Sequence, residues 1–514
     1  MNLTDGVLAA DELRAAVAHG TPETIARTAM SHLWPLYSEH FDELTRVVET
    51  LPPPVLTRYP ALRVLHRMTP VLARTTRPFK PLVDPDNARA MAPDELDFVT
   101  LAQIVAFRFS GDVAAALIYA RRLEERIQQF RETSFERTDG PLWFYHHQIG
   151  STFLAAGDTS RALLEFATSR QLGRLSQQPD AERAALGRIA LAHAVRGSLD
   201  DAELALAAVA TQPPATPAHR ASTAATERTA AAIIGVERMA PNVEDLLADL
   251  ERYDSIELTW PFALLARTRA LIALQRPDEA IEVVRLTSEA HPDQHGSVAS
   301  DVIAAASVHA LWALGAPSAA RRVAESSPRG GLLSKLAIAR LALLECRWEA
   351  ADAALQRLAA DPSFGPGPRV ELLLMSAWHE YGSTDTVAPG TAAHVARLAA
   401  RDGSRRIVSM MPVQLVDSIR EALPAAEAAV FEREVSGLAH VDAPRRPTLT
   451  RGELRVLNIL PAHTTTAQIA AVIHVSPNTV KSQLKSLYRK LGCSTREDAM
   501  IIASRFHLLA EDGG

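Results

Sequence analysis

Cysteine is nearly absent from this sequence, because its 514 residues include only Cys346 and Cys493. Two thiols so far apart exclude a disulfide framework and a cysteine-based metal cluster. Buried thiols in a reducing compartment are the expectation, so we expect a cytoplasmic protein without a structural metal.

Long apolar runs are missing as well. The most apolar stretch, residues 299–320, contains Asp301 and His309, and no charge-free run of about 18 apolar residues occurs. Residues 1–5 lack the basic and apolar segments of a secretory signal. The sequence therefore predicts neither a membrane span nor a signal peptide.

Residue patterns of catalysis and cofactor binding are absent too. No Ser-His-Asp or paired-carboxylate arrangement stands out, and the sequence contains no Gly-Lys-Ser/Thr that could cradle a phosphate. His146 and His147 have no third ligand at metal spacing, so we expect them to pack within a helix. We predict that the protein is not an enzyme and holds no cofactor.

Lysine is scarce and unevenly placed. Only five of the 54 basic residues are lysines, and three of them, Lys481, Lys485 and Lys490, fall within ten positions. From Arg445 onward ten basic residues face five acidic ones, whereas residues 1–444 carry 44 basic and 55 acidic residues. A basic C-terminal module on an acidic body predicts that only the module approaches a polyanion.

What the sequence does have is helix-forming residues. Aromatic residues make up only 5% of the chain, alanine and leucine dominate, and this mixture favours packed helices over sheets. Between about residues 8 and 438 a signature recurs, in which a turn residue and a few polar residues are followed by alanine. The closing alanines are Ala116, Ala162, Ala202, Ala280, Ala320 and Ala351.

Most of these alanines lie about 40 residues, or a multiple of 40, apart, and a degenerate copy near residues 237–241 would fill the largest gap. Such a period is typical of stacked helical hairpins, in which each hairpin covers the apolar face of the next. We therefore predict an all-α fold whose body resembles a tetratricopeptide-like superhelix. An irregular helical bundle is the alternative.

The C-terminal segment carries four helix-start signals in about 45 residues. They are Thr450 with Glu453, Thr465 with Gln468, Ser476 with Pro477, and Ser494 with Glu497. They predict a first helix over residues 451–460 and a second that begins after Thr465 and reaches residue 473. A third helix should run from residue 477 to a left-handed cap at Gly492, and a fourth from the Ser494 cap to about residue 509.

The third of these helices is amphipathic. Val480, Leu484, Leu487 and Leu491 share one side, whereas Asn478, Ser482, Lys485 and Arg489 share the other, with Lys481 beside them. The polar row is about 16 Å long. It suits the major groove of double-stranded DNA, with lysine donating to guanine and Arg489 contacting phosphate. A solvated charged face is the alternative.

These residues also carry a family resemblance. The module resembles the LuxR-type helix-turn-helix in five motifs: Leu449-Thr450-Arg451-Gly452-Glu453, Ile469-Ala470, Ser476-Pro477-Asn478-Thr479-Val480-Lys481, Tyr488-Arg489-Lys490-Leu491-Gly492 and Arg496-Glu497-Asp498-Ala499. The resemblance implies that Lys481, Ser482 and Lys485 reach bases. Our full set of candidate DNA-binding residues adds Asn478, Thr479, Gln483, Arg489, Thr465 and Thr466.

The resemblance further implies that the fourth helix pairs two copies of the chain; contact with the helical body is the alternative. The sequence departs from the family pattern at Gly452, Arg455, His463 and Gln483. His463 replaces a loop glycine, so we expect positive φ there, at a cost of about 1 kcal/mol.

A second resemblance covers residues 32–62, which look like the start of the helical-repeat region in the large ATP-binding LuxR-family regulators, here without a P-loop. We divide the chain into a helical-repeat domain (1–440), a linker (441–448) and a helix-turn-helix domain (449–514). The expected function is regulation of transcription as a homodimer on promoter DNA, with a protein, peptide or small-molecule signal on the repeats. The alternative is an interaction scaffold with a vestigial DNA-binding module.

Overall fold

The structure, a computed structural model, describes residues 3–66, 91, 93–133, 140–217, 219–250, 258–292, 296–326, 331–361, 364–402, 405–441, 447, 449–506 and 508–509. Over these residues the regular structure is helical, and the only β-type pairing is an isolated bridge between Pro412 and Val441. The predicted all-α fold is therefore confirmed. No helix in these ranges is long and apolar enough to cross a membrane.

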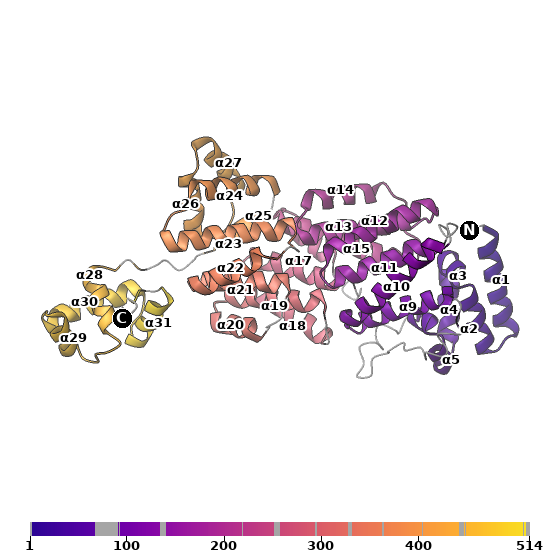
Figure 1. Cartoon of the computed structure of the whole chain (residues 1–514), viewed down its shortest axis with the longest axis horizontal. Coiled ribbons are helices and arrows are strands. Elements are labelled where there is room, and N and C mark those ends of the chain that lie inside the picture. Colours follow the sequence, from indigo (N-terminus) through magenta and orange to yellow (C-terminus); the bar gives the residue numbers. More distant parts are fainter. Residues whose placement is uncertain are drawn as a thin grey trace.

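The helices form an elongated stack (Figure 1). Six N-terminal helices lie at one end and build their own apolar cluster around Leu13, Leu36 and Leu44. They are α1 (Leu3–His19), α2 (Pro22–Ser31), α3 (Leu33–Glu39), α4 (Phe41–Thr50), α5 (Pro53–Arg58) and α6 (Pro60–Leu65).

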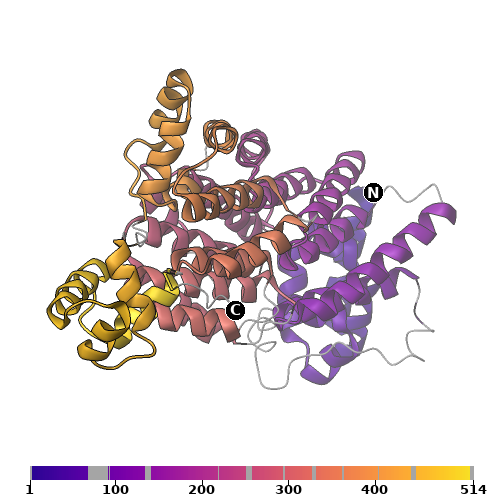
Figure 2. The ribbon, with the colours of Figure 1, turned by 60° about the vertical axis from the view of Figure 1, so that its left-hand side comes forward.

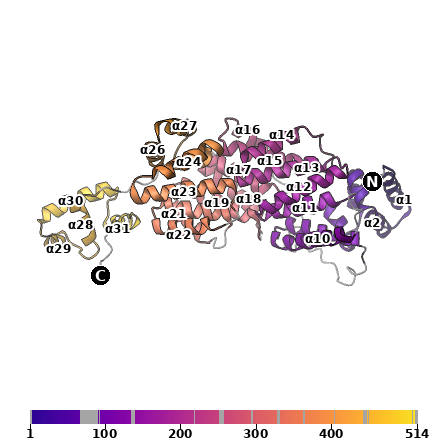
Figure 3. The same ribbon diagram turned by 45° about the horizontal axis from the view of Figure 1, so that its top comes forward.

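The middle of the stack consists of helix pairs. They are α9 (Pro93–Phe109) with α10 (Val113–Thr133), α11 (Leu142–Ala155) with α12 (Thr159–Leu175), α13 (Ala181–Arg196) with α14 (Leu199–Ala210), α15 (Arg220–Glu237) with α16 (Val243–Ala248), α17 (Trp260–Ala273) with α18 (Pro277–Ala290), α19 (Val298–Ala313) with α20 (Pro317–Ser326), and α21 (Leu332–Leu344) with α22 (Trp348–Ala359). Figure 3 shows the pairs following one another along the long axis, as a tetratricopeptide-like superhelix requires.

The turn inside each of these pairs has the same backbone geometry. The first residue of every predicted signature has positive φ, and the predicted degenerate copy is present as well, at Met239. These residues are Gly111, Gly157, Gly197, Met239, Gln275, Gly315 and Cys346, with φ between 52° and 87°. The N–H that follows each of them donates to a carbonyl five residues earlier, as from Asp158 to Phe153 at 2.9 Å. This is the Schellman ending of a helix, which glycine adopts most easily.

The closing alanines are fully buried. Ala116, Ala162, Ala202, Ala280, Ala320 and Ala351 are all 0% exposed. A methyl group at this position lets the second helix of each hairpin approach the first closely, so the signature encodes both the turn and the packing distance.

The turn geometry gives a testable stability difference. Gly315 has φ 74° and would have no atom within 4 Å of an added Cβ, so Gly315→Ala tests backbone strain alone. We expect it to lower the free energy of unfolding by about 1 kcal/mol, and Gln275→Gly, at φ 60°, to raise it by up to about 1 kcal/mol. Urea unfolding followed by tryptophan fluorescence measures both. Gly390→Ala, equally open but without positive φ, should cause no loss.

The C-terminal part of the body adds α23 (Pro366–Thr384), α24 (Pro389–Asp402), α25 (Arg405–Ser409), α26 (Val413–Ala422) and α27 (Ala425–Val435). Helices α24, α26 and α27 stand out from the row as the orange helices of Figures 1 and 2. Five charged side chains from α15, α17, α21, α23 and α25 meet beneath them. Glu237 accepts from Arg269 at 2.7 Å and from Arg406 at 2.8 Å, and Arg340 donates to Glu371 at 2.7 Å.

Candidate nucleic-acid interface

The C-terminal module consists of α28 (Arg451–Ile459), α29 (Thr466–Ile473), α30 (Pro477–Leu491) and α31 (Arg496–Arg505). Both predicted capping boxes are present, at Thr450 with Glu453 and at Thr465 with Gln468. Ser476 accepts from the N–H of Thr479 at 3.1 Å, and Gly492 ends α30 with φ 68°. The first three helices therefore begin where their local signals predict.

Three local predictions were wrong. Thr495, not Ser494, caps the fourth helix, because its hydroxyl accepts from the N–H of Asp498 at 3.0 Å, and α31 ends at Arg505 rather than near residue 509. Positive φ occurs at His474 (57°), which ends α29, and His463 is not among the positive-φ residues. Positive φ was expected in the loop between α28 and α29, but it occurs in the tight turn that joins α29 to α30.

The apolar side of α30 holds the module together. Val480 and Leu487 are fully buried, Leu491 is buried and Leu484 is half-buried, all in one cluster with α28, α29 and α31. Residues at spacings of three, four and seven face the same way on a helix, so this burial fixes the direction of the opposite side.

That opposite side is open to solvent. Asn478, Thr479, Lys481, Ser482, Lys485 and Arg489 are all exposed. Helix α30 contains no acidic residue, so its outward side presents cations and hydroxyl or amide groups only. The structure thus brings six of the nine candidate residues onto one continuous face.

The remaining three candidates lie differently. Gln483 is half-buried and its amide lies beside Gly452, where an added Cβ would come within 2.6 Å of Nε2. Thr465 is exposed, but its hydroxyl already accepts from the N–H of Gln468 at 3.2 Å. Thr466 is half-buried at the start of α29.

The third lysine of α30 has an internal role that the sequence did not reveal. Lys490 donates to the buried carboxylate of Glu453 on α28 at 2.7 Å. Burial alone would raise the pKa of Glu453, but hydrogen bonds from Lys490 and from the Thr450 N–H outweigh it and lower that pKa to about 2. One carboxylate therefore caps α28 and ties it to α30.

A second unforeseen tie joins the ends of the module. The Arg496 guanidinium, at the start of α31, donates to the Leu460 carbonyl at the end of α28. A cation at a helix C-terminus satisfies a carbonyl and complements the helix dipole. The basic count of the module thus overstates its outward charge, because Lys490 and Arg496 stabilise the fold.

Glu453→Gln should destabilise the module. The lowered pKa means that the ionised carboxylate contributes its stability above the unfolded-state pKa of roughly 4.3, and that this stability is lost as pH falls toward 2. We expect a loss of about 2 kcal/mol at pH 7, measured by hydrogen exchange of α28 and α30 in the full chain, and a smaller loss at pH 4. Glu497→Gln, an exposed site on α31, is the matched control. Equal protection in both variants would contradict the role of Glu453.

The module also touches the body. Its apolar cluster includes Cys346, the turn residue before α22, and packs against Trp348 at the start of α22. Figure 1 shows α31 as the module helix nearest this end of the stack. The apolar cluster of the module is thus continuous with the start of α22, whereas Ile501 on α31 is 67% exposed.

These features define a helix-turn-helix module in which α30 packs its apolar side inward and exposes a cationic side. Residues 447–503 match the family described as bacterial regulatory proteins, luxR family, and the module is a LuxR-family helix-turn-helix domain. Two proteins of Mycobacterium tuberculosis, from strains CDC 1551 / Oshkosh and ATCC 25618 / H37Rv, are named probable transcriptional regulatory protein NarL. Each is 42% identical to this chain over 67 residues, which are 13% of this chain and 31% of the relative. The chain thus spans about a third of the length of these curated relatives.

Proposed function

We propose that this chain is a DNA-binding transcription regulator, in which residues 449–514 read the major groove and residues 1–440 form a helical-repeat domain that receives a signal. The linker of this division is 441–448. The observation that carries the proposal is the exposed face of α30, where Lys481, Ser482 and Lys485 stand opposite the buried Val480 and Leu487.

The likeness to the two proteins named as probable transcriptional regulators supports this proposal. A major groove about 12 Å wide admits one helix, and a lysine can donate to the N7 and O6 atoms of guanine. Within the proposal Lys481, Ser482 and Lys485 contact bases. Asn478, Thr479, Arg489, Thr465 and Thr466 contact the sugar-phosphate backbone, and Gln483 lies at the edge of the interface.

Pairing of two copies on DNA is part of the proposal. A single small module covers little DNA surface, so a two-part site gains affinity and specificity. The exposed Ile501 on α31 supports such pairing, since the repeats cover other apolar residues of the module but leave this one open.

Footprinting of the full chain on the DNA upstream of its own coding region tests the proposal. We expect a protected site of two similar halves and an affinity that falls steeply with salt. Absence of a footprint, together with capture of a protein partner by the full chain, would support a scaffold with a vestigial DNA-binding module instead.

A further inference from the structure

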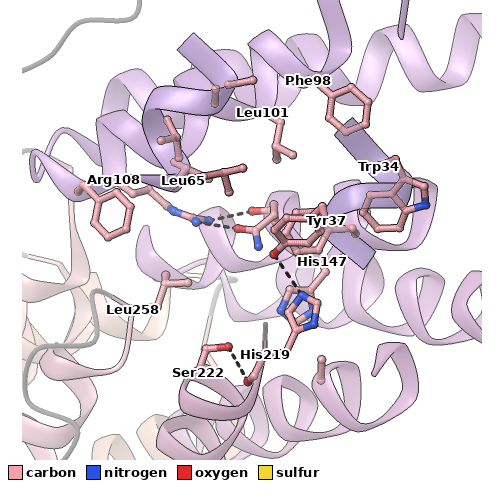
Figure 4. A pocket seen from close by; sticks show the side chains of 18 of the residues that line it. Trp34, Tyr37, Leu65, Phe98, Leu101, Arg108, His147, His219, Ser222 and Leu258 are labelled. Atoms are coloured by element: carbon pink, nitrogen blue, oxygen red, sulfur yellow. Dashed lines mark hydrogen bonds between the residues drawn. The ribbon is translucent and has the colours of Figure 1, made fainter. Parts of the chain in front are cut away.

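A cavity of about 380 Å³ lies where the N-terminal helices α3 and α6 meet α9, α11, α13 and α15 of the repeats. This volume falls in the range of small-molecule sites. Figure 4 shows Phe98 and Leu101 of α9 on one side of it, and His219 and Ser222 on the opposite side. The N-terminal helices have an apolar cluster of their own, so the cavity lies between two units of the body, a frequent place for a ligand site.

Most of the wall is aromatic or aliphatic. Although aromatic residues make up only 5% of the chain, Trp34, Tyr37, Phe98, Phe109 and Phe144 all line this one cavity. The Trp34 ring lies 5.9 Å from that of Tyr37 and 6.0 Å from that of Phe144, so these rings form a continuous surface. Such a wall suits a ligand whose body is apolar and flat or extended.

Two titratable side chains of the wall are uncharged. Burial, more than any neighbouring charge, lowers the pKa of His147 well below its usual value. Burial also raises the pKa of Tyr37, with a smaller contribution from the charge of Asp180. Near pH 7 the wall therefore presents a neutral imidazole and a neutral phenol, and none of the described residues that line the cavity is acidic.

The two arginines of the wall are engaged within the protein. Arg108 donates to the Gln148 carbonyl at 3.1 Å and to its side-chain oxygen at 2.7 Å, as Figure 4 shows, and Arg188 has interactions of its own. Neither guanidinium is therefore assigned to a ligand. Burial of an ionised ligand group without a partner is unfavourable, so this wall favours an uncharged ligand.

Helix α15 adds a polar side to the cavity, a row of three hydroxyl groups. The Thr226 hydroxyl donates to the Ser222 carbonyl at 2.7 Å. The hydroxyls of Ser222 and Thr223 donate to the His219 carbonyl at 3.3 Å and 2.9 Å. A hydroxyl has one hydrogen to donate and two lone pairs, so these bonds use the donors and leave the oxygen atoms as acceptors. The ligand group that matches this row is a donor such as a hydroxyl.

Contacts of His219 fix the two sides of the cavity relative to each other. Its Nδ1 lies 2.8 Å from the carboxylate of Asp180, and its Nε2 lies 3.3 Å from the hydroxyl of Tyr37. These contacts join the starts of α13 and α15 to α3, so the aromatic side and the hydroxyl row are held in place without a ligand. A preformed wall keeps the entropic cost of binding low.

We propose that this cavity binds a neutral, largely apolar alcohol or phenol. Its aromatic or aliphatic body lies against Trp34, Tyr37 and Phe98, and its hydroxyl donates to the hydroxyl oxygens of α15. The proposal deepens the signal-receiving role given to the helical-repeat domain and rests on the proposed function only for its consequence on DNA.

Isothermal titration of the full chain without DNA tests the proposal with matched probes. They are 3-phenylpropan-1-ol and 1-octanol, each compared with its methyl ether, which lacks the donor, and with the carboxylate of the same chain length. We expect saturable binding of at least one alcohol. Its ether should bind roughly two- to ten-fold more weakly, because one neutral hydrogen bond is lost. Its carboxylate should bind at least about ten-fold more weakly, because its charge would be buried without a partner.

Three results would overturn the proposal. They are the absence of saturable binding of both alcohols up to their solubility limits, an ether that binds as tightly as its alcohol, and a carboxylate that binds as tightly as its alcohol. The last result would mean that the wall accepts an anion.

A double variant tests the hydroxyl row. Ser222→Ala, Thr226→Val removes two of its oxygen atoms and should abolish the preference for the alcohol over its ether. The matched control is Ser307→Ala, Thr229→Val. Both control residues lie outside the cavity wall, and their hydroxyls donate in the same way to carbonyls four residues earlier, each at 2.7 Å. If the cavity variant keeps the full preference, the hydroxyl row is not the acceptor.

A single variant tests the cavity independently of the hydroxyl row. Val105→Phe fills the cavity from α9 and should weaken the binding of alcohol and ether alike. Val413→Phe makes the same change at an exposed position and should leave both affinities unchanged. If Val105→Phe folds and binds the alcohol as tightly as the unmodified chain does, the site is wrong.

The titration separates this proposal from the one on DNA. In a Lys481→Ala, Lys485→Ala double variant the alcohol should bind with unchanged affinity, because both lysines lie on α30 of the C-terminal module. Loss of DNA binding in that variant leaves the assignment of the cavity intact, and failure of alcohol binding leaves the assignment of α30 intact.

Discussion

Lys481→Ala and Lys485→Ala should each weaken the binding of the chain to its DNA site by about 1–3 kcal/mol. Both side chains are exposed on the outward face of α30, whose other side is fixed by the buried Val480 and Leu487. A lysine that donates to a base edge contributes affinity for the right sequence only, so each variant should also relax base preference at one position. Fluorescence anisotropy with the footprinted site and with single-base variants of that site measures both effects.

A lysine of the body and an arginine of α30 provide the comparisons. Lys335→Ala removes an exposed lysine from α21 of the body and should leave DNA affinity unchanged. Arg489→Ala removes a charge near the end of α30 and should weaken binding to all sequences alike, with a salt dependence shallower by about one unit of slope. If Lys481→Ala, Lys485→Ala and Lys335→Ala all bind alike, α30 is not the recognition helix.

The module could be predicted from sequence because its signals are local. A threonine that bonds to the N–H three residues on, or a serine before a proline, fixes a helix start within four residues, and Thr450, Thr465 and Ser476 act in this way. At the fourth start Ser494 and Thr495 are adjacent candidates with similar hydroxyls. The local rule does not choose between them, and in the structure Thr495 takes this role.

The repeats could be predicted for a related reason. Each of these hairpin turns has one residue with positive φ, and in all but the turn at Met239 an alanine follows five positions later. The signature could therefore be recognised even where Gln275 and Cys346 replace glycine. The regular spacing of the signatures along the chain then predicted that the hairpins stack on one another.

Tertiary partners could not be predicted. From the sequence, Lys490 resembles the other outward cations of α30. Its partner Glu453 lies 37 residues earlier on α28, so only the packing of the two helices shows the ion pair. The cavity is a stronger example, since Trp34, His147 and His219 come from separate helical elements. Only the stacking of these elements shows that residues expected to pack within helices share one wall.

The second large effect is expected from Glu371→Gln, within the buried group of charges that joins five helices of the body. Glu371 and Arg340 are 6% and 4% exposed, and Glu371 accepts from Arg340 at 2.7 Å. Burial alone would raise the pKa of Glu371, but Arg340, Arg406 and Arg269 outweigh it and lower that pKa to about 2. Removing this negative charge leaves the buried Arg340 and Arg406 and the half-buried Arg269, with Glu237 as the remaining carboxylate of the group.

We expect Glu371→Gln to lower the free energy of unfolding of the body by about 3–5 kcal/mol at pH 7, because breaking a buried ion pair leaves its partner uncompensated. The lowered pKa fixes the pH dependence. The ionised carboxylate contributes fully above the unfolded-state pKa of roughly 4.3, and its contribution disappears as pH falls toward 2. The difference between the variant and the unmodified chain should therefore shrink in acid. Urea unfolding followed by tryptophan fluorescence at pH 7 and pH 4 measures it.

Two further variants test whether the loss of stability in Glu371→Gln arises because the ion pair is buried. Glu244→Gln removes the carboxylate from an exposed pair with Arg276 and should cost less than about 1 kcal/mol. The double variant Glu371→Met, Arg340→Met replaces both charges with apolar side chains of similar length and should recover much of the stability lost in Glu371→Gln, since no charge of that pair is left stranded. The ion pair would not be the link between α21 and α23 if Glu371→Gln cost no more than Glu244→Gln. Recovery in the double variant would show that the loss comes from a buried charge without its partner rather than from a missing attraction.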